Sequence, residues 1–399
     1  MLRDEGSHKQ DGIRGSLAPN DRIGDLTMHF AWSNLSYDRL RFSVTVAGVA
    51  FSIFLMVFQG SLLMGFVKSS SRMVDSSDGE IWVSAVGIPC FECATPIAGR
   101  LKAIAMGEPG VVAVQKIAAG AAIWQKPSGR RQIVYIIGSE PGVGSQFPIN
   151  YLPHSTSVVE QDAVLVDRSN ATLLEADEIG TEGEINNLRA RISNIVNDFG
   201  SFVGYPYLFT DYSDAIHYLG MTSEEAQFLV IHVSPRYPID QVRNSLQARL
   251  QGVHVWTREG FSHRSQVYWI VQTGAGGALL TAALLGFVVG LLIVSQTIYA
   301  TTMENLDEFA TMKALGAPKH YLQILVLTQG LISGLFGAAI GLGLTFPAVS
   351  LSRKSIPWIY LPWWLPLSMI GVSLIMCAMA SLGSIRKAVM VEPARVFRA

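Results

Sequence analysis

The sequence is short of charge and of cysteine for its length. Asp, Glu, Lys and Arg make up 15% of its 399 residues, against roughly 25% in typical soluble proteins. The 30 basic and 31 acidic residues nearly cancel, so no global positive field favours a nucleic-acid partner. Three cysteines are too few for a disulfide-rich scaffold. Disordered, collagen-like and small secreted proteins are excluded, and a membrane protein is the leading class.

The sequence also lacks the common catalytic motifs. It has no G-x-x-x-x-G-K-[ST] phosphate loop, no H-E-x-x-H and no G-x-S-x-G, which argues against ATP hydrolysis, zinc proteolysis and a nucleophile elbow. Its long apolar stretches carry none of the charges that mark a proton relay. We therefore expect no enzyme activity, no metal and no directly bound cofactor, and an energy source in another chain.

Hydrophobic residues, 49% of the chain, are concentrated in four stretches without Asp, Glu, Lys or Arg. Each stretch is longer than the roughly 20 residues that a helix needs to cross a bilayer. A charge at the centre of such a helix would cost about 2.5–3.5 kcal/mol, so the uncharged runs predict four transmembrane helices. The stretches are Phe42–Val67, Ser265–Met303, Tyr321–Ser352 and Ser355–Ile385.

The spacing of these helices predicts the domain organisation. A long insert with the charge density of a soluble domain separates the first helix from the second. An even number of helices places both termini on one side, and the flanking Lys and Arg residues slightly favour the cytoplasm. The prediction is a cytoplasmic leader with an interfacial amphipathic helix (1–41), transmembrane helix 1 (42–67), an extracytoplasmic α+β domain (68–266), transmembrane helix 2 (267–300), a cytoplasmic coupling helix (301–320), transmembrane helix 3 (321–350), a short extracytoplasmic loop (351–361), transmembrane helix 4 (362–385) and a cytoplasmic tail (386–399).

The interfacial helix is predicted from Asn20–Phe42, where apolar residues alternate with polar ones: Ile23, Leu26, Phe30, Trp32 and Leu35. Such a pattern favours a helix that lies in the plane of the membrane interface. An ordinary polar leader is the alternative.

The insert alternates strand-like and helix-like patterns. Mostly apolar runs that are rich in β-branched or aromatic residues and bounded by turn formers predict strands. The apolar spacing in Ile239–Leu250, after Pro238, predicts an amphipathic helix. An α+β fold follows. The predicted strands are Glu80–Val86, Val111–Ile117, Ala121–Trp124, Gln132–Gly138, Ala163–Val166, Phe228–Val233 and Val253–Trp256.

The connection between the second and third transmembrane helices has the pattern of a short amphipathic helix. Residues at helical spacing give one apolar face with a basic end, acidic residues near the start suit the helix dipole, and Gly316 offers a C-cap before Pro318. A solvated connector on the membrane surface and a coupling helix that docks on a cytoplasmic partner both fit. The apolar face is Leu306, Phe309, Ala310 and Lys313, and the acidic group is Glu304, Asp307 and Glu308.

The same connection carries a family resemblance. Glu308-Phe-Ala-Thr-Met-Lys-Ala-Leu-Gly-Ala317 resembles the E-x-x-x-[LM]-[KR]-A-[LM]-G segment of FtsX/MacB-type ABC transporter permeases, whose order of helices and domain is also similar. One departure is Glu304-Asn-Leu-Asp307, where many FtsX-type members carry an Arg-rich stretch. Within the family the chain is most similar to DevC-type exporter permeases, through Ala31-Trp-Ser-Asn-Leu35, Val46-Ala-Gly-Val-Ala-Phe51, Val255-Trp-Thr-Arg-Glu-Gly-Phe261, Tyr268-Trp269 and Val391-Glu-Pro-Ala-Arg-Val-Phe397.

The resemblance implies a homodimeric permease in the bacterial cytoplasmic (inner) membrane, driven by a separate ATPase subunit that binds ATP and Mg²⁺. The expected function is to couple ATP hydrolysis to movement of the extracytoplasmic domain and to export of a lipid-like or hydrophobic substrate from the membrane lipid. A membrane-fusion adaptor and an outer-membrane channel are further expected partners. The alternative is an FtsX-type mechanotransmitter that exports nothing and regulates an extracytoplasmic partner such as a cell-wall hydrolase.

The resemblance also implies a site for ATPase coupling. The body of the docking helix is expected at Thr302–Ala310. The expected coupling residues are Glu304, Asp307, Glu308, Phe309, Lys313, Leu315 and Gly316.

Glycines recur every fourth residue within two of the predicted transmembrane helices. Small residues at this spacing let helix backbones approach closely in lipid. Packing within one subunit and packing between two subunits both fit. The pairs are Gly286 with Gly290, Gly330 with Gly334, and Gly337 with Gly341.

Two polar features of the insert complete the candidates. Cys90 and Cys93 fall where oxidation is possible. A local disulfide or two unpaired thiols is favoured, with redox chemistry and a metal or haem site as alternatives. An acidic run favours a solvated hairpin over a cation site; its residues are Glu175, Asp177, Glu178, Glu182 and Glu184.

Overall fold

The computed structural model describes residues 39–140, 161–197, 199–316 and 318–390. They fall into two compact units. The predicted interfacial helix, apart from its last residues, and the family-like segments 31–35 and 391–397 lie outside the described residues. The first unit holds the described parts of Met1–Met56, Leu284–Leu344 and Pro366–Ala399, and the second holds Val57–Ala283 and Thr345–Leu365.

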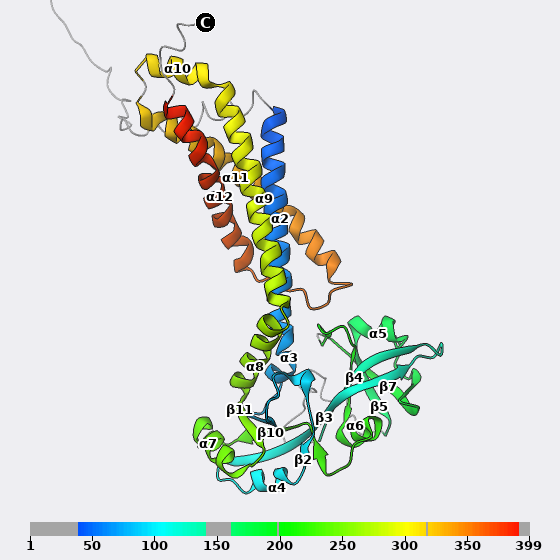
Figure 1. Cartoon of the computed structure of the whole chain (residues 1–399). Coiled ribbons are helices and arrows are strands. Elements are labelled where there is room, and N and C mark those ends of the chain that lie inside the picture. The colour runs from blue at the N-terminus through cyan, green and yellow to red at the C-terminus, as the bar shows by residue number, and fades with distance from the viewer. Residues whose placement is uncertain (1–38, 141–160, 198, 317, 391–399) are drawn as a thin grey trace, which may run out of the picture. The chain divides into compact units, whose positions relative to one another are not determined.

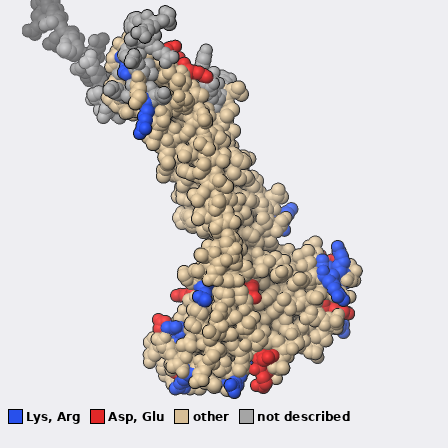
Figure 2. All heavy atoms as spheres, viewed as in Figure 1, with Lys and Arg blue, Asp and Glu red and all other residues tan. Residues whose placement is uncertain are grey.

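Four long helices carry the apolar stretches (Figure 1). Within the described residues, these four are long and apolar enough to cross a membrane, which confirms the predicted number. On the face shown in Figure 2, charged side chains lie around the short helix α10 and over the α+β domain, and few lie along the long helices. The four are α2 (Arg39–Ser70), α9 (Ala275–Glu304), α11 (Lys319–Ser352) and α12 (Trp364–Met390).

The start of the second transmembrane helix was predicted too early. The described chain forms α8 (Arg258–Val267) and a π-helical turn, η3 (Tyr268–Gln272), before α9 begins. Gly274 has a φ of +75°, a left-handed conformation that interrupts the helix. The prediction began too early because the residues of η3 are as free of charge as those of α9, so the absence of charge did not mark where α9 begins.

The α+β domain is built on a nine-stranded mixed sheet of the described residues, in the order β11-β1-β10-β3-β4-β8-β5-β7-β6. β4 pairs with β8, and β5 with β7, in parallel; the other neighbours in this order are antiparallel. A separate pair, β2 (Ile97–Ala98) and β9 (Glu225–Ala226), lies outside it. The strands of the sheet are β1 (Ile81–Ala85), β3 (Val111–Gln125), β4 (Arg131–Ser139), β5 (Ala163–Asp167), β6 (Glu182–Ile185), β7 (Leu188–Val196), β8 (Tyr207–Asp211), β10 (Phe228–Val233) and β11 (Val253–Thr257).

The long strand β3 replaces two predicted strands. It pairs with β10 through its first half and with β4 from Ile117 to Gln125. Its middle residues, Ala118–Gly120, lack the β-branched side chains that marked the flanking runs. Ala118 and Gly120 face helix α6 (Tyr212–Leu219), which packs closely there: a Cβ at Gly120 would lie 3.1 Å from Leu219.

Short helices cover the sheet and, among the described residues, enclose three apolar cores. One core surrounds Trp82, Phe91 and Phe228, and a second surrounds Trp124 beneath α5 (Arg168–Leu174) and α6. The third lies beneath α4 (Leu101–Met106) and α7 (Ile239–Arg249). The predicted helix at Ile239–Leu250 is therefore present as α7, with Val242 and Leu246 buried.

The acidic run lies partly in the hairpin of β6 and β7. Asn186 and Asn187 form its turn with φ of +50° and +67°, the left-handed conformations that two-residue hairpins require. Glu182 pairs with Arg189, and Glu175 with Arg130. No group of three potential metal ligands occurs in the described chain.

Candidate functional site

The helix predicted to couple to an ATPase is α10 (Leu306–Ala314), which joins α9 to α11 (Figure 1). Leu306, Phe309 and Ala310 form its buried face. Asp307 and Glu308, in the first turn, are exposed and lie where the helix dipole favours negative charge. Gly316 follows the C-cap with a φ of +94°, a conformation that suits glycine. The result is a short helix whose apolar face is buried and whose acidic face is exposed.

The structure places the predicted coupling residues in two groups. Glu304, Asp307, Glu308, Leu315 and Gly316 are exposed, and Lys313 is half-buried. Phe309 is only 1% exposed, so it holds the helix in place and offers no surface to a partner. Its part in coupling, through the packing of this helix, stays a prediction.

The predicted helix body, Thr302–Ala310, begins too early and ends too early, because α10 runs from Leu306 to Ala314. Thr302 and Glu304 belong to the end of α9, because this helix continues past its apolar stretch before the chain breaks at Asn305.

All six predicted packing glycines face other helices of the same chain. A Cβ at Gly286 would lie 3.4 Å from Leu55, one at Gly334 would lie 2.8 Å from Cys377, and one at Gly337 would lie 2.5 Å from Val49. The glycines therefore allow α9 and α11 to approach α2 and α12 closely. The remaining three make equivalent contacts: Gly290 with Ser52, Gly330 with Ser381 and Gly341 with Ala50.

A second candidate site lies in the second unit, where the ends of the long helices meet the α+β domain. Four aromatic rings from four separate segments form what we call the aromatic cluster: Phe66 of α2, Phe202, Trp269 of η3 and Trp358. Phe66 lies 5.4 Å from Phe202, 6.5 Å from Trp269 and 6.1 Å from Trp358 between ring centroids. Each such pair contributes about 0.5–1.5 kcal/mol beyond the burial of its area. The cluster therefore binds these four segments together.

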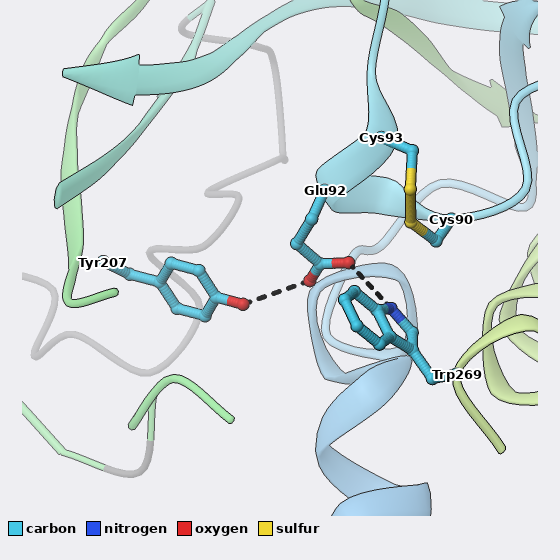
Figure 3. Close-up of a disulfide and its surroundings, with 5 residues drawn as sticks. All are labelled: Cys90, Glu92, Cys93, Tyr207 and Trp269. Carbon is cyan, nitrogen blue, oxygen red and sulfur yellow. Dashed lines mark hydrogen bonds between the residues drawn. A yellow bond between two sulfur atoms is a disulfide. The ribbon is translucent and has the colours of Figure 1, made fainter. Parts of the chain in front are cut away.

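Glu92 connects the aromatic cluster to the core of the domain (Figure 3). Its Oε2 accepts a hydrogen bond from Nε1 of Trp269 at 3.3 Å, and its Oε1 accepts one from the hydroxyl of Tyr207 at 3.1 Å. Burial raises the pKa of Glu92 to about 7, because a carboxylate loses its hydration there. Burial, followed by the charge of Glu92, also raises the pKa of Tyr207 and of Tyr135. Glu92 is thus a carboxyl group that can change its protonation state near neutral pH.

Glu92 is held by the segment between the two cysteines. Cys90 and Cys93 form a disulfide with a Cα–Cα distance of 5.3 Å, and Phe91–Cys93 form a 3₁₀ turn, η1. Phe91 stacks on Phe228 at 5.2 Å, which anchors the turn in the core. The pairing makes both sulfurs unavailable as metal ligands in this form. It leaves a structural bridge that orients Glu92 toward Trp269.

Sequence reasoning missed Glu92 and most of the aromatic cluster. Tyr268-Trp269 was noticed only through the family resemblance. A carboxylate between two closely spaced cysteines was the signal available for Glu92, because a short disulfide turn limits where that side chain can point. The other partners come from segments that only the fold brings together.

Comparison with known proteins finds two family domains in the chain. Residues 42–249 match the MacB-like periplasmic core domain, and residues 280–393 match the FtsX-like permease C-terminal family. An uncharacterized ABC transporter permease of Mycobacterium tuberculosis is 23% identical over 372 residues, covering 90% of this chain and 95% of the relative. One of Mycobacterium bovis is 23% identical over 363 residues with the same coverage.

Similar solved structures cover the α+β domain. The periplasmic region of MacB from Actinobacillus actinomycetemcomitans has a TM-score of 0.37 at 10% identity, over 48% of this chain and 94% of that chain. The extracellular domain of the noncanonic ABC-type transporter YknZ from Gram-positive bacteria has a TM-score of 0.33 at 9% identity, over 45% and 99%. On the strength of the two family matches and the four apolar helices, the chain belongs to the FtsX/MacB-type ABC transporter permeases, inner-membrane proteins with an extracytoplasmic domain.

Proposed function

We propose that the chain is the permease subunit of an ABC exporter, coupling ATP hydrolysis by a separate ATPase subunit to movement of its extracytoplasmic domain and to export of a lipid-like or hydrophobic substrate. The observation that carries the proposal is α10. Its apolar face is buried while Asp307 and Glu308 are exposed. A movement of a partner bound to the acidic face would therefore be transmitted to the residues against which the apolar face packs. ATP and Mg²⁺ would be held by that partner, since the chain has no phosphate loop.

The aromatic cluster supports transmission at the extracytoplasmic end. Phe66 belongs to α2, and Trp269 belongs to the turn that leads into α9. Because Phe202 contacts both rings, a displacement of either helix end must move the domain or break the cluster. A homodimer would present two such linkages, and a membrane-fusion adaptor with an outer-membrane channel would receive the movement beyond the domain.

The same linkage supports the second candidate function, a mechanotransmitter that regulates an extracytoplasmic hydrolase. Both functions require ATPase docking and domain movement. They differ in whether a hydrophobic substrate leaves the membrane.

The test begins with affinity purification of the full chain from native membranes, followed by ATPase assays of the complex in lipid nanodiscs. Glu308→Ala removes an exposed charge from α10, and Gly316→Trp places a bulky side chain at a positive φ. We expect an ATPase to co-purify and Glu308→Ala to weaken its binding about fivefold, as the loss of about 1 kcal/mol implies; Gly316→Trp should weaken it further.

Glu178→Ala is the matched control, because Glu178 is an exposed carboxylate of the α+β domain. It should leave ATPase binding unchanged. The coupling proposal fails if no ATPase co-purifies, or if both α10 variants behave like the control. Transfer of fluorescent lipid out of the nanodisc would then separate export, which requires it, from pure mechanotransmission, which does not.

A further inference from the structure

Arginines gather around a cavity of about 270 Å³ at the end of the long helices, within the second unit. Three chain segments contribute them. Arg72 is the first residue of α3 (Arg72–Asp75), two residues after α2 ends at Ser70. Arg168 is the first residue of α5, and Arg353 follows the last residue of α11. We call this space the arginine cavity. It shares Trp358 with the aromatic cluster, and no residue of α10 lines it.

The arginine cavity carries an excess of positive charge. Its one acidic lining residue, Asp167, is buried and already accepts hydrogen bonds from the amides of Ser169 and Phe199, at 2.9 and 2.6 Å, and from the Ser169 hydroxyl. None of the three arginines forms an ion pair with a carboxylate of a described residue. Three positive charges thus face one carboxylate whose oxygens are engaged elsewhere.

Two of the arginines are held in place without losing their phosphate-binding groups. Arg168 donates its Nε–H to Oδ1 of Asn197 at 3.1 Å, which leaves both of its terminal nitrogens for a ligand. Arg72 places its guanidinium over the ring of Phe199, 5.5 Å from the centroid. A planar guanidinium held in this way is suited to bidentate binding of phosphate oxygens.

The position of the cavity along the helices indicates where its ligand comes from. Ser69, at the end of α2, and Trp358 line it together with Arg353. Lys68 of α2 lies over the ring of Tyr360 at 4.3 Å, and Trp363, which like Tyr360 lies between α11 and α12, is 81% exposed. Exposed tryptophan with tyrosine and lysine at the ends of transmembrane helices is typical of the headgroup level of a membrane.

We propose that the arginine cavity binds the phosphate group of a membrane phospholipid headgroup at the extracytoplasmic surface. A volume of about 270 Å³ is just below the size of pockets that enclose whole drug-sized ligands. It admits a glycerol-phosphate headgroup and leaves the acyl chains in the bilayer. The site goes beyond the proposed function, because an exporter and a mechanotransmitter could equally hold a lipid there.

The test measures the midpoint of thermal unfolding of the full chain in detergent with added short-chain ligands. The ligands are dioctanoyl phosphatidylglycerol, dioctanoyl glycerol, which lacks the phosphate, and inorganic phosphate. A ligand that binds the folded state raises the midpoint in proportion to the logarithm of its concentration over Kd. We expect phosphatidylglycerol to raise it and dioctanoyl glycerol to leave it unchanged. An equal shift with inorganic phosphate would show that free phosphate suffices as the source of the anion.

The variant Arg168→Gln/Arg353→Gln removes two guanidinium groups and leaves Arg72 on Phe199. It should bind phosphatidylglycerol at least about tenfold more weakly, the loss expected when charge-assisted hydrogen bonds are removed. Arg236→Gln, at an exposed arginine outside the cavity, is the control and should bind normally. Equal binding by the double variant, or an equal response to dioctanoyl glycerol, would overturn the proposal. If the double variant does not fold without ligand, the single variants Arg353→Gln and Arg353→Lys replace it, because Arg353 is exposed. Arg353→Gln should bind phosphatidylglycerol more weakly than Arg353→Lys, which keeps the positive charge.

Discussion

Trp269 donates its indole N–H to Oε2 of Glu92 across 3.3 Å, and this bond joins the turn that leads into α9 to the disulfide turn of the domain. The Tyr207 hydroxyl binds the other carboxylate oxygen. A single carboxyl group thus lies between a transmembrane helix and the core of the extracytoplasmic domain. Its protonation state affects both hydrogen bonds, so pH becomes a probe of this junction.

The stability of the chain should fall as pH rises toward neutrality, and Glu92 should account for part of the fall. Its pKa is about 7 in the folded chain and 4.5 for the ordinary group. Between these values the folded state holds more protons than the unfolded state. The free energy of unfolding therefore falls as pH rises through this window, by at most about 1.4 kcal/mol per unit of pKa difference.

Thermal unfolding of the full chain from pH 5 to 8 measures this slope. Glu92→Gln keeps an acceptor for Trp269 and removes the titration, so its slope should be flatter and its midpoint at pH 8 higher than in the wild type. Glu178→Gln, at an exposed site, should keep the wild-type slope. Parallel slopes for the wild type and Glu92→Gln would contradict the assignment.

Phe309 should affect coupling because its buried side chain packs α10 in place. Its side chain is 1% exposed, whereas Leu315 of the same segment is 85% exposed. Truncation of a buried Phe costs about 3–5 kcal/mol. Phe309→Ala should therefore lower the unfolding midpoint and abolish stimulation of the co-purified ATPase. Leu315→Ala should weaken ATPase binding without changing the midpoint; the reverse pattern would place Phe309, not Leu315, at the partner surface.

The fold was largely predictable because its signals are local. Uncharged runs marked the four transmembrane helices, and the apolar spacing of Val242 and Leu246 marked α7. The start of α9 was mispredicted because a lack of charge does not distinguish the residues of the transmembrane helix from those of the turn η3 that precedes it. The single strand β3 was predicted as two strands because small residues interrupt its β-branched pattern. These residues leave room for helix α6, and a contact with a distant helix cannot be read from periodicity.

The candidate sites were predictable only in part. The acidic face of α10 and the glycine at its end were predictable because their residues lie in one contiguous segment that also carries the family resemblance. Burial raises the pKa of Glu92, and the Tyr207 and Trp269 side chains that bind its carboxylate lie more than a hundred residues away. The arginine cavity likewise joins Arg72, Arg168 and Arg353. Contacts between distant segments leave no pattern in a single sequence.

The glycines of α11 should differ in their tolerance of a methyl group. A Cβ at Gly337 would lie 2.5 Å from Val49, while nothing lies within 4 Å of one at Gly343. Gly337→Ala should destabilise the helices by about 1–3 kcal/mol through overpacking, seen as a lower unfolding midpoint in detergent. Gly343→Ala, the control, should be neutral or slightly stabilising, because alanine favours helix. Equal midpoints for the two variants would contradict the close approach of α11 to α2.

The disulfide should stabilise the chain modestly and act through the orientation of Glu92. It closes a loop of only about four residues, for which the loss of chain entropy in the unfolded state is worth about 2 kcal/mol. Cys90→Ala/Cys93→Ala should therefore lower the unfolding midpoint, and reductant should lower the wild-type midpoint by a similar amount. Cys377→Ala, at a buried free cysteine in α12, should remain sensitive to reductant, whereas the double variant should not. The double variant should also show a flatter pH slope, because η1 no longer holds Glu92 against Trp269 and Tyr207. An unchanged slope would mean that Phe91 alone, stacked on Phe228, fixes the turn.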